Sequence, residues 1–109
     1  MPTTYKVLGQ LAPAAVTLST AYTVPSSTSA VVSTITAANR SSAVDTIRIA
    51  VRPTGESIAN KHYITYDEQL GGNVTAGYTI GISLATTDVI SVYSTNGTTS
   101  FNIFGSEIA

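Results

Sequence analysis

Residues 45–52, DTIRIAVR, decide the fold class of this chain. Three aliphatic side chains alternate with polar or small ones along this stretch, at Ile47, Ile49 and Val51. Successive side chains of a β-strand point to opposite faces of the sheet, so a period of two predicts a strand with one buried face and one outer face. Both arginines of the stretch, Arg48 and Arg52, belong to the outer face.

The same alternation continues on both sides of this stretch. It occurs at residues 4–10, 16–24, 30–38, 62–66, 75–84, 88–94 and 100–104. These runs are rich in Val, Ile, Thr and Tyr, which favour strands, and turn-forming residues separate them. A helical turn fits at residues 53–61 alone. The sequence therefore predicts an all-β protein, a single domain over residues 1–109 that forms an antiparallel β-sandwich or jelly-roll-like domain of about eight strands.

The pattern also predicts a core and a hairpin. The inward-facing residues are expected to be Ile47, Ile49, Val51, Ile80, Ile82, Leu84, Ile90, Val92 and Ile103. Asn96–Gly97 is typical of a two-residue type I′ turn, because both residues adopt positive φ at low cost. This turn is expected to join the last two long strands as an antiparallel pair.

The composition excludes several functions. Charged residues make up 10% of the 109 residues and the net charge is −1, so no basic surface is expected for nucleic acid or a membrane. The absence of Cys excludes disulfides, thiol catalysis and Cys-ligated zinc. We expect synthesis in a reducing cytoplasm without a signal peptide or membrane span. The 31 Ser and Thr residues give a weakly charged surface that favours assembly with other protein.

Residues 45–67 contain most of the chain's potential chemistry. The basic and imidazole groups are Arg48, Arg52, Lys61 and His62, and the acids are Asp45, Glu56 and Asp67. One histidine and six scattered acids do not supply a metal site, and no Gly-x-Ser-x-Gly nucleophile motif is present. We predict no catalytic residue, no cofactor and no metal, with His62 as an end-of-strand residue that bonds a neighbour.

Two regions are predicted interfaces. Arg48 and Arg52 share an outer strand face, where they either contact a partner's carboxylate or pair locally with Asp45 or Asp67. Apolar residues occur on both faces of the terminal segments, which predicts contact with a sister copy or with another protein of a larger assembly, and a homo-oligomer, a trimer or a dimer. The residues concerned are Tyr5, Leu8, Leu11, Phe104 and Ile108. The alternative is that both termini fold back onto their own sandwich.

Several stretches resemble small virion structural proteins of tailed bacteriophages, notably those infecting cyanobacteria and marine bacteria. They are YKVLGQ at 5–10, YTVP at 22–25, VVSTI at 31–35, NR at 39–40, RIAVRP at 48–53, KHYITYD at 61–67, GISLATTDVISVY at 81–93 and SFNIFGSEI at 100–108. The resemblance covers almost the whole chain, in order and at similar spacing.

The resemblance implies a non-enzymatic protein present in many copies on the exterior of a virion and made in the host cytoplasm. The expected role is that of a capsid cement, or decoration, protein that binds over junctions of major capsid subunits and stabilises the head. One alternative is a module associated with the tail, baseplate or fibre. Another alternative, suggested by the tyrosines themselves, is a carbohydrate-binding β-sandwich that uses Tyr63, Tyr66 or Tyr78 as a stacking surface.

Overall fold

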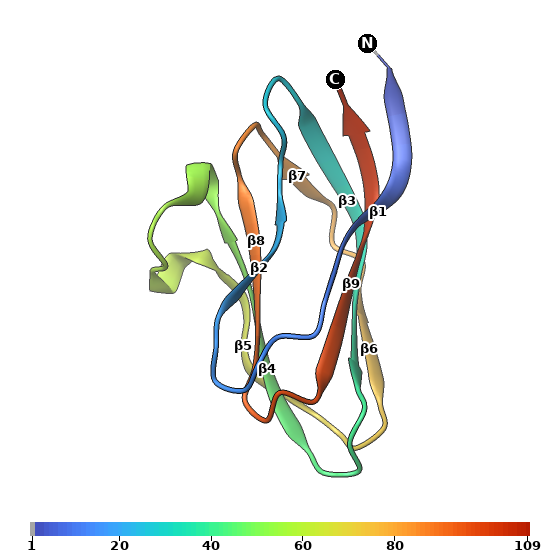
Figure 1. The fold of residues 1–109 in the computed structure, drawn as a ribbon, viewed down its shortest axis with the longest axis vertical. Helices are drawn as coiled ribbons and strands as arrows, with labels where there is room; N and C mark the ends of the chain where they lie inside the picture. Colours follow the sequence, from blue (N-terminus) through green and yellow to red (C-terminus); the bar gives the residue numbers. More distant parts are fainter. Residues whose placement is uncertain (1) are drawn as a thin grey trace.

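In this computed structural model, which describes residues 2–109, nine strands form two antiparallel sheets that pack face to face (Figure 1). Sheet A has the order β1 (Thr3–Leu11), β9 (Thr99–Ile108), β3 (Ser29–Asn39) and β6 (Thr75–Tyr78), and β7 (Ile82–Leu84) pairs with the other half of β3. Sheet B has the order β2 (Ser19–Thr23), β8 (Val89–Ser94), β4 (Asp45–Arg52) and β5 (Tyr63–Leu70).

The strand pairing is that of a jelly roll. β1 pairs with β9, β2 with β8, β3 with β6 and β7, and β4 with β5. The chain therefore follows the path of one long antiparallel hairpin that is wound into two facing sheets. The tip of this hairpin is residues 53–62, which hold two short 3₁₀ turns, Pro53–Gly55 and Asn60–His62. The predicted fold class and the predicted helical turn are confirmed.

One predicted strand is divided in two. Residues 75–84 form β6 and β7, and Gly81 between them adopts a φ of +65°. Glycine adopts this left-handed conformation without steric strain because it lacks a Cβ. The break interrupts the alternation, and the prediction that Ile80 is buried is wrong, since its side chain is 54% exposed.

The core lies between the sheets and contains most of the predicted residues. Fully buried side chains include Ile35, Ile47, Ile49, Ile90, Val92, Phe101 and Ile103. Val51 and Ile82 were predicted to be buried but are only partly buried, because they pack against the edge of this cluster. The alternation in residues 45–52 thus identifies the inner face of β4 correctly and fails at its C-terminal end.

The predicted hairpin at Asn96–Gly97 is wrong. β8 belongs to sheet B and β9 to sheet A, so residues 95–98 cross between the sheets and do not join paired strands. Gly97 has a φ of +72°, whereas Asn96 is not among the positive-φ residues that a type I′ turn requires. The backbone N–H of Asn96 instead donates to Asp45 Oδ1 (2.9 Å), which ties the connection to β4.

A buried polar cluster closes this end of the sandwich. Asp45 Oδ2 accepts hydrogen bonds from the hydroxyls of Ser94 and Thr99, and its Oδ1 accepts from the N–H groups of Thr46 and Asn96. Asn39 donates to the carbonyl oxygens of residues 43, 70 and 71. The two side chains therefore fix three connections to one another, namely residues 40–44, 71–74 and 95–98.

Tyrosine–glutamate pairs span both lateral edges of the sandwich. Tyr22 of β2 donates to Glu107 of β9 (2.6 Å), and Tyr78 of β6 donates to Glu68 of β5. Burial and the bond to Glu107 raise the pKa of Tyr22, and the same bond lowers the pKa of Glu107. Each pair links sheet A to sheet B, so these four side chains, two phenols and two carboxylates, have structural partners.

Candidate functional site

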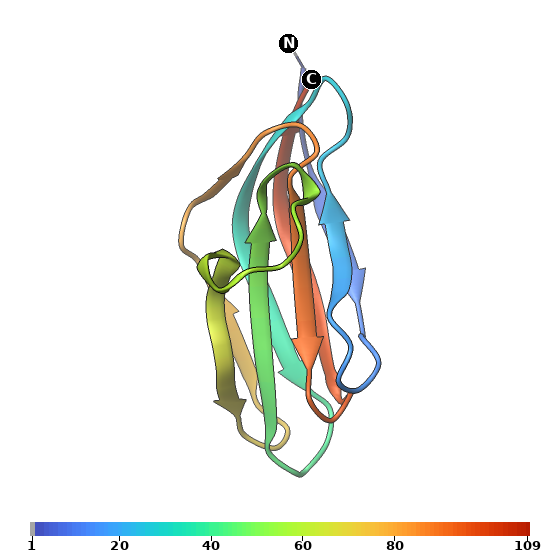
Figure 2. The same ribbon diagram turned by 90° about the vertical axis from the view of Figure 1, so that its left-hand side faces the viewer.

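The charged window of residues 45–67 separates into three structural clusters. Asp45 belongs to the buried polar cluster described above. The second cluster lies in residues 53–62, which fold over the outer face of sheet B (Figure 2). Arg52 donates from Nε to Ser91 Oγ (3.1 Å) and from Nη1 to the carbonyl oxygen of Glu56 (2.9 Å). Arg52, predicted as an interface residue, therefore holds this excursion against its own sheet.

His62 is buried beneath the same excursion. Its Nδ1 accepts a hydrogen bond from the backbone N–H of Ala59 (3.0 Å), and its Nε2 lies 3.1 Å from Glu56 Oε1. With Nδ1 as the acceptor, Nε2 carries the proton and donates to the carboxylate. Both ring nitrogens thus have local partners, as expected for a histidine that bonds its neighbours.

Replacement of this histidine should loosen the excursion. We expect His62→Ala to lower the free energy of unfolding by about 1–3 kcal/mol, because two hydrogen bonds of a buried side chain are lost. Amide exchange at Ala59 should accelerate. The neighbouring Lys61→Ala, which removes an exposed side chain, should change stability by less than about 0.5 kcal/mol. Equal effects of the two substitutions in urea unfolding would contradict the assigned role of His62.

Arg48 is the centre of the third cluster. Its guanidinium lies 4.2 Å from the ring centroid of Tyr66 and 4.3 Å from that of Tyr93. Its Nε donates to Asp67 Oδ1 (2.6 Å), and the side chain of Tyr63 meets Tyr66 edge to face, with centroids 4.8 Å apart. Of the alternatives predicted for Arg48, the structure shows the local pair with Asp67.

An irregularity in β5 brings the members of this cluster together. The β4–β5 register shifts between Ile47 and Ile49, so Tyr66 and Asp67 both lie opposite Arg48. Asp67 has a φ of +52°, and a bulge of this kind can aim two consecutive side chains at one neighbour. Strict alternation places such residues on opposite faces, which is why the sequence did not predict this arrangement.

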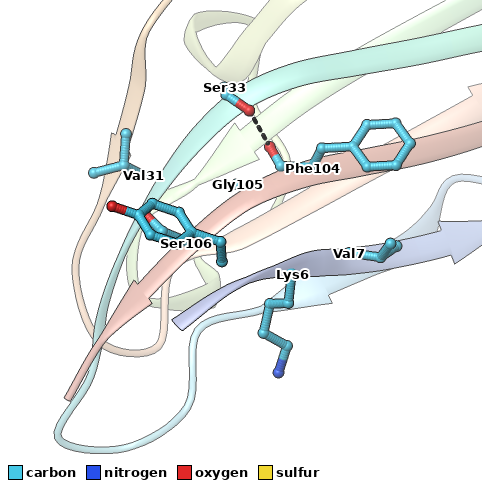
Figure 3. Close-up of a pocket in the computed structure, with 8 residues that line it drawn as sticks. Lys6, Val7, Val31, Ser33, Phe104, Gly105 and Ser106 are labelled. Carbon is cyan, nitrogen blue, oxygen red and sulfur yellow. Dashed lines mark hydrogen bonds between the residues drawn. The ribbon is translucent and has the colours of Figure 1, made fainter. Parts of the chain in front are cut away.

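A shallow apolar hollow occupies the outer face of sheet A. The strand register aligns Tyr5, Ser106 and Val31 in one row and Val7 with Phe104 in the next. The hollow has a volume of about 520 Å³ and is lined by Tyr5, Lys6, Val7, Val31, Ser33, Phe104, Gly105 and Ser106 (Figure 3). The sequence had predicted that Tyr5 and Phe104 lie at a contact surface, and the structure brings both side chains to this hollow.

The other terminal residues have different positions. Leu8 and Leu11 pack partly buried against the core, so they belong to the sandwich itself. Ile108 is half-buried near the end of β9. The termini thus contribute both to the core and to an apolar outer face.

The outer face of sheet A carries little charge. Within its five strands, only Lys6 and Glu107 are charged. Glu107 is directed at Tyr22 of sheet B, and Lys6 pairs with Glu107 at 3.2 Å. In Figure 3 the side chain of Lys6 points away from Phe104 and Val31. The outer face of sheet A therefore consists mainly of uncharged side chains, with Lys6 as the charged residue that lines the hollow, which distinguishes it from that of sheet B.

The described residues contain no cluster of side chains suited to a metal ion. Within residues 2–109, no three His, Cys, Asp or Glu side chains gather where they could hold an ion. In the same part of the chain, no buried side-chain nitrogen or oxygen lacks a hydrogen-bond partner. Neither short helical turn between residues 2 and 109 has the length or apolar character needed to cross a membrane.

Comparison of the chain with models of known protein families and with curated proteins finds no match. The geometry of the chain itself offers two candidate sites, namely the hollow on sheet A and the Arg48 cluster on sheet B.

Proposed function

We propose that this chain is a non-enzymatic structural protein of a bacteriophage particle, and that it acts as a capsid decoration protein. The observation that carries the proposal is the largely uncharged, apolar outer face of sheet A around Phe104 and Tyr5. The sequence resemblance to virion proteins is the reason for proposing a location on a phage particle. The jelly roll is a fold that viral coat proteins also use. Because one fold hosts many functions, the fold alone does not carry the proposal.

Another protein can cover such a face with a gain in free energy. Tyr5 is 84% exposed and Phe104 is 37% exposed, so burial against another protein removes apolar surface from water. Little charge must be desolvated in the process, because the charged residue that lines the hollow, Lys6, is already paired with Glu107. An uncharged surface of a major capsid protein at a subunit junction is a partner of matching chemistry. The contact predicted for the termini therefore involves Tyr5 and Phe104, which face outward, and not Leu8 and Leu11, which pack against the core.

The geometry of residues 45–67 supports a non-enzymatic role. Asp45, Arg48 and Arg52 each have hydrogen-bond partners within the sandwich, and the sole histidine, His62, is occupied at both ring nitrogens. A tail, baseplate or fibre location would use the same face and is the alternative. A homo-oligomeric state, dimer or trimer, stays a prediction that light scattering of the purified protein tests.

The test is the copy number per particle. Quantitative mass spectrometry of purified virions should give hundreds of copies for wild type, and cryo-EM should place them on the head. Phe104→Asp should reduce the copy number at least about tenfold, because a carboxylate would be buried without a partner at the contact. A few dozen copies would contradict the decoration role and favour the baseplate or fibre.

Ile64→Asp is the matched control. Ile64 is also 37% exposed but lies on β5 of sheet B. Its substitution should leave the copy number unchanged, and both purified variants should keep the wild-type circular dichroism spectrum. If Phe104→Asp folds and is incorporated as well as wild type, sheet A is not the docking face.

A further inference from the structure

The outer face of sheet B has its own hollow, beside the Arg48 cluster. It is lined by Asn60, Tyr63 and Tyr66 and has a volume of about 500 Å³. We call it the aromatic hollow. Its residues belong to the end of the excursion of residues 53–62 and to edge strand β5, which follows it directly. This face is separate from the proposed docking face, so it would stay accessible on a protein that is docked through sheet A.

The rings of the aromatic hollow are held in place before any ligand binds. Tyr63 and Tyr66 are nearly perpendicular, with an interplanar angle of 81°. Arg48 packs over the Tyr66 ring at 4.2 Å and is itself held by Asp67. Despite these contacts Tyr66 remains 56% exposed. An aromatic side chain that is both fixed and exposed can bind a flat apolar surface at a low cost in conformational entropy.

The surrounding charges favour a neutral ligand. Arg48 is paired with Asp67 at 2.6 Å, and Lys61 lies 3.9 Å from Glu56. Each cation near the aromatic hollow thus has an acid beside it, so neither a phosphate nor a carboxylate ligand has an unpaired cation to bind. Three residues line the hollow, so its surface is small compared with a protein–protein interface of standard size.

The geometry points to a saccharide-binding site in the aromatic hollow. A sugar ring has an apolar C–H face, which can stack on Tyr66, and peripheral hydroxyls that require donors and acceptors. The phenol of Tyr63 and the amide of Asn60 offer both types of group at the rim. Tyr78, which the sequence also offered as a stacking surface, does not belong to this site, because it faces the core and bonds Glu68.

The test is an NMR titration of the full-length protein. The probes are methyl β-glucoside, methyl β-galactoside and N-acetylglucosamine, each to about 50 mM, because a contact with one sugar ring is expected to have a millimolar Kd. At least one probe should cause saturable shifts of the Tyr63 and Tyr66 ring signals and of the Asn60 side-chain amide. Absence of saturable shifts with all three probes would overturn the proposal.

Variants identify the stacking ring. Tyr66→Ala should raise the Kd at least about tenfold, whereas Tyr66→Phe, which keeps the ring, should stay within about threefold of wild type. Asn60→Ala leaves the Arg48 contacts intact and should weaken binding at least about threefold. Tyr5→Ala, which removes an even more exposed tyrosine from sheet A, should have no effect. Unchanged binding by a folded Tyr66→Ala, or the same shifts with glycerol, would refute a saccharide site.

Discussion

Ile49→Ala should lower the free energy of unfolding by about 2–5 kcal/mol, the range found when a buried aliphatic side chain is truncated in a core. Ile49 is fully buried in β4, with core residues of both sheets in the same cluster. The loss combines the transfer free energy of the deleted methylene and methyl groups with the cost of the cavity that they leave. Urea unfolding followed by circular dichroism measures it.

Ile80→Ala is the control for this substitution. The same atoms are removed, but Ile80 is 54% exposed between β6 and β7, so the change should be within about 0.5 kcal/mol of wild type. The alternation of the sequence predicts equal losses at the two positions, whereas the structure predicts different ones. Similar losses for both variants would contradict the position of Ile80.

The strands could be predicted from the sequence because each has one buried face. In β4 the alternation of Ile47 and Ile49 with outer residues marks the strand and its inner face correctly. Such a pattern does not specify which strands pair. Residues 95–98 have the composition of a hairpin, yet they connect two sheets, because the buried Asp45 binds the N–H of Asn96. Local turn preference was overridden by a contact between residues about fifty positions apart.

The candidate sites were predicted less well than the fold. The terminal residues Tyr5 and Phe104 could be selected because both are large, apolar and near chain ends. Leu8 could not be distinguished from them, since the register shift between Val7 and Gly9 of β1 disturbs the alternation there. The Arg48 cluster depends on the bulge at Asp67, and nothing in the sequence marks a bulge at a residue other than glycine.

The buried carboxylate of Asp45 should make stability depend on pH. Its side chain is 1% exposed, and burial alone would raise its pKa. The hydrogen bonds from Ser94, Thr99, Asn96 and Thr46 outweigh burial and hold the pKa of Asp45 below its ordinary value of 3.8. Protonation therefore occurs at higher pH in the unfolded chain than in the folded protein.

Asp45→Asn should lower the free energy of unfolding at pH 7 by about 3 kcal/mol or more, because the amide accepts fewer hydrogen bonds and places a donor among donors.

In wild type the contribution of Asp45 is fully present above its unfolded pKa and is lost as the pH falls through the lower, folded pKa. The difference in stability between wild type and Asp45→Asn should thus be constant above about pH 5 and should shrink below about pH 4. The pKa of Glu107 is also lowered, but Glu107 is present in both proteins. Its effect on stability therefore cancels in the difference, which reports the titration of Asp45. Urea unfolding at a series of pH values measures it. A difference that stays constant down to pH values at which both proteins still fold would mean that Asp45 is not the ionised acceptor of this cluster.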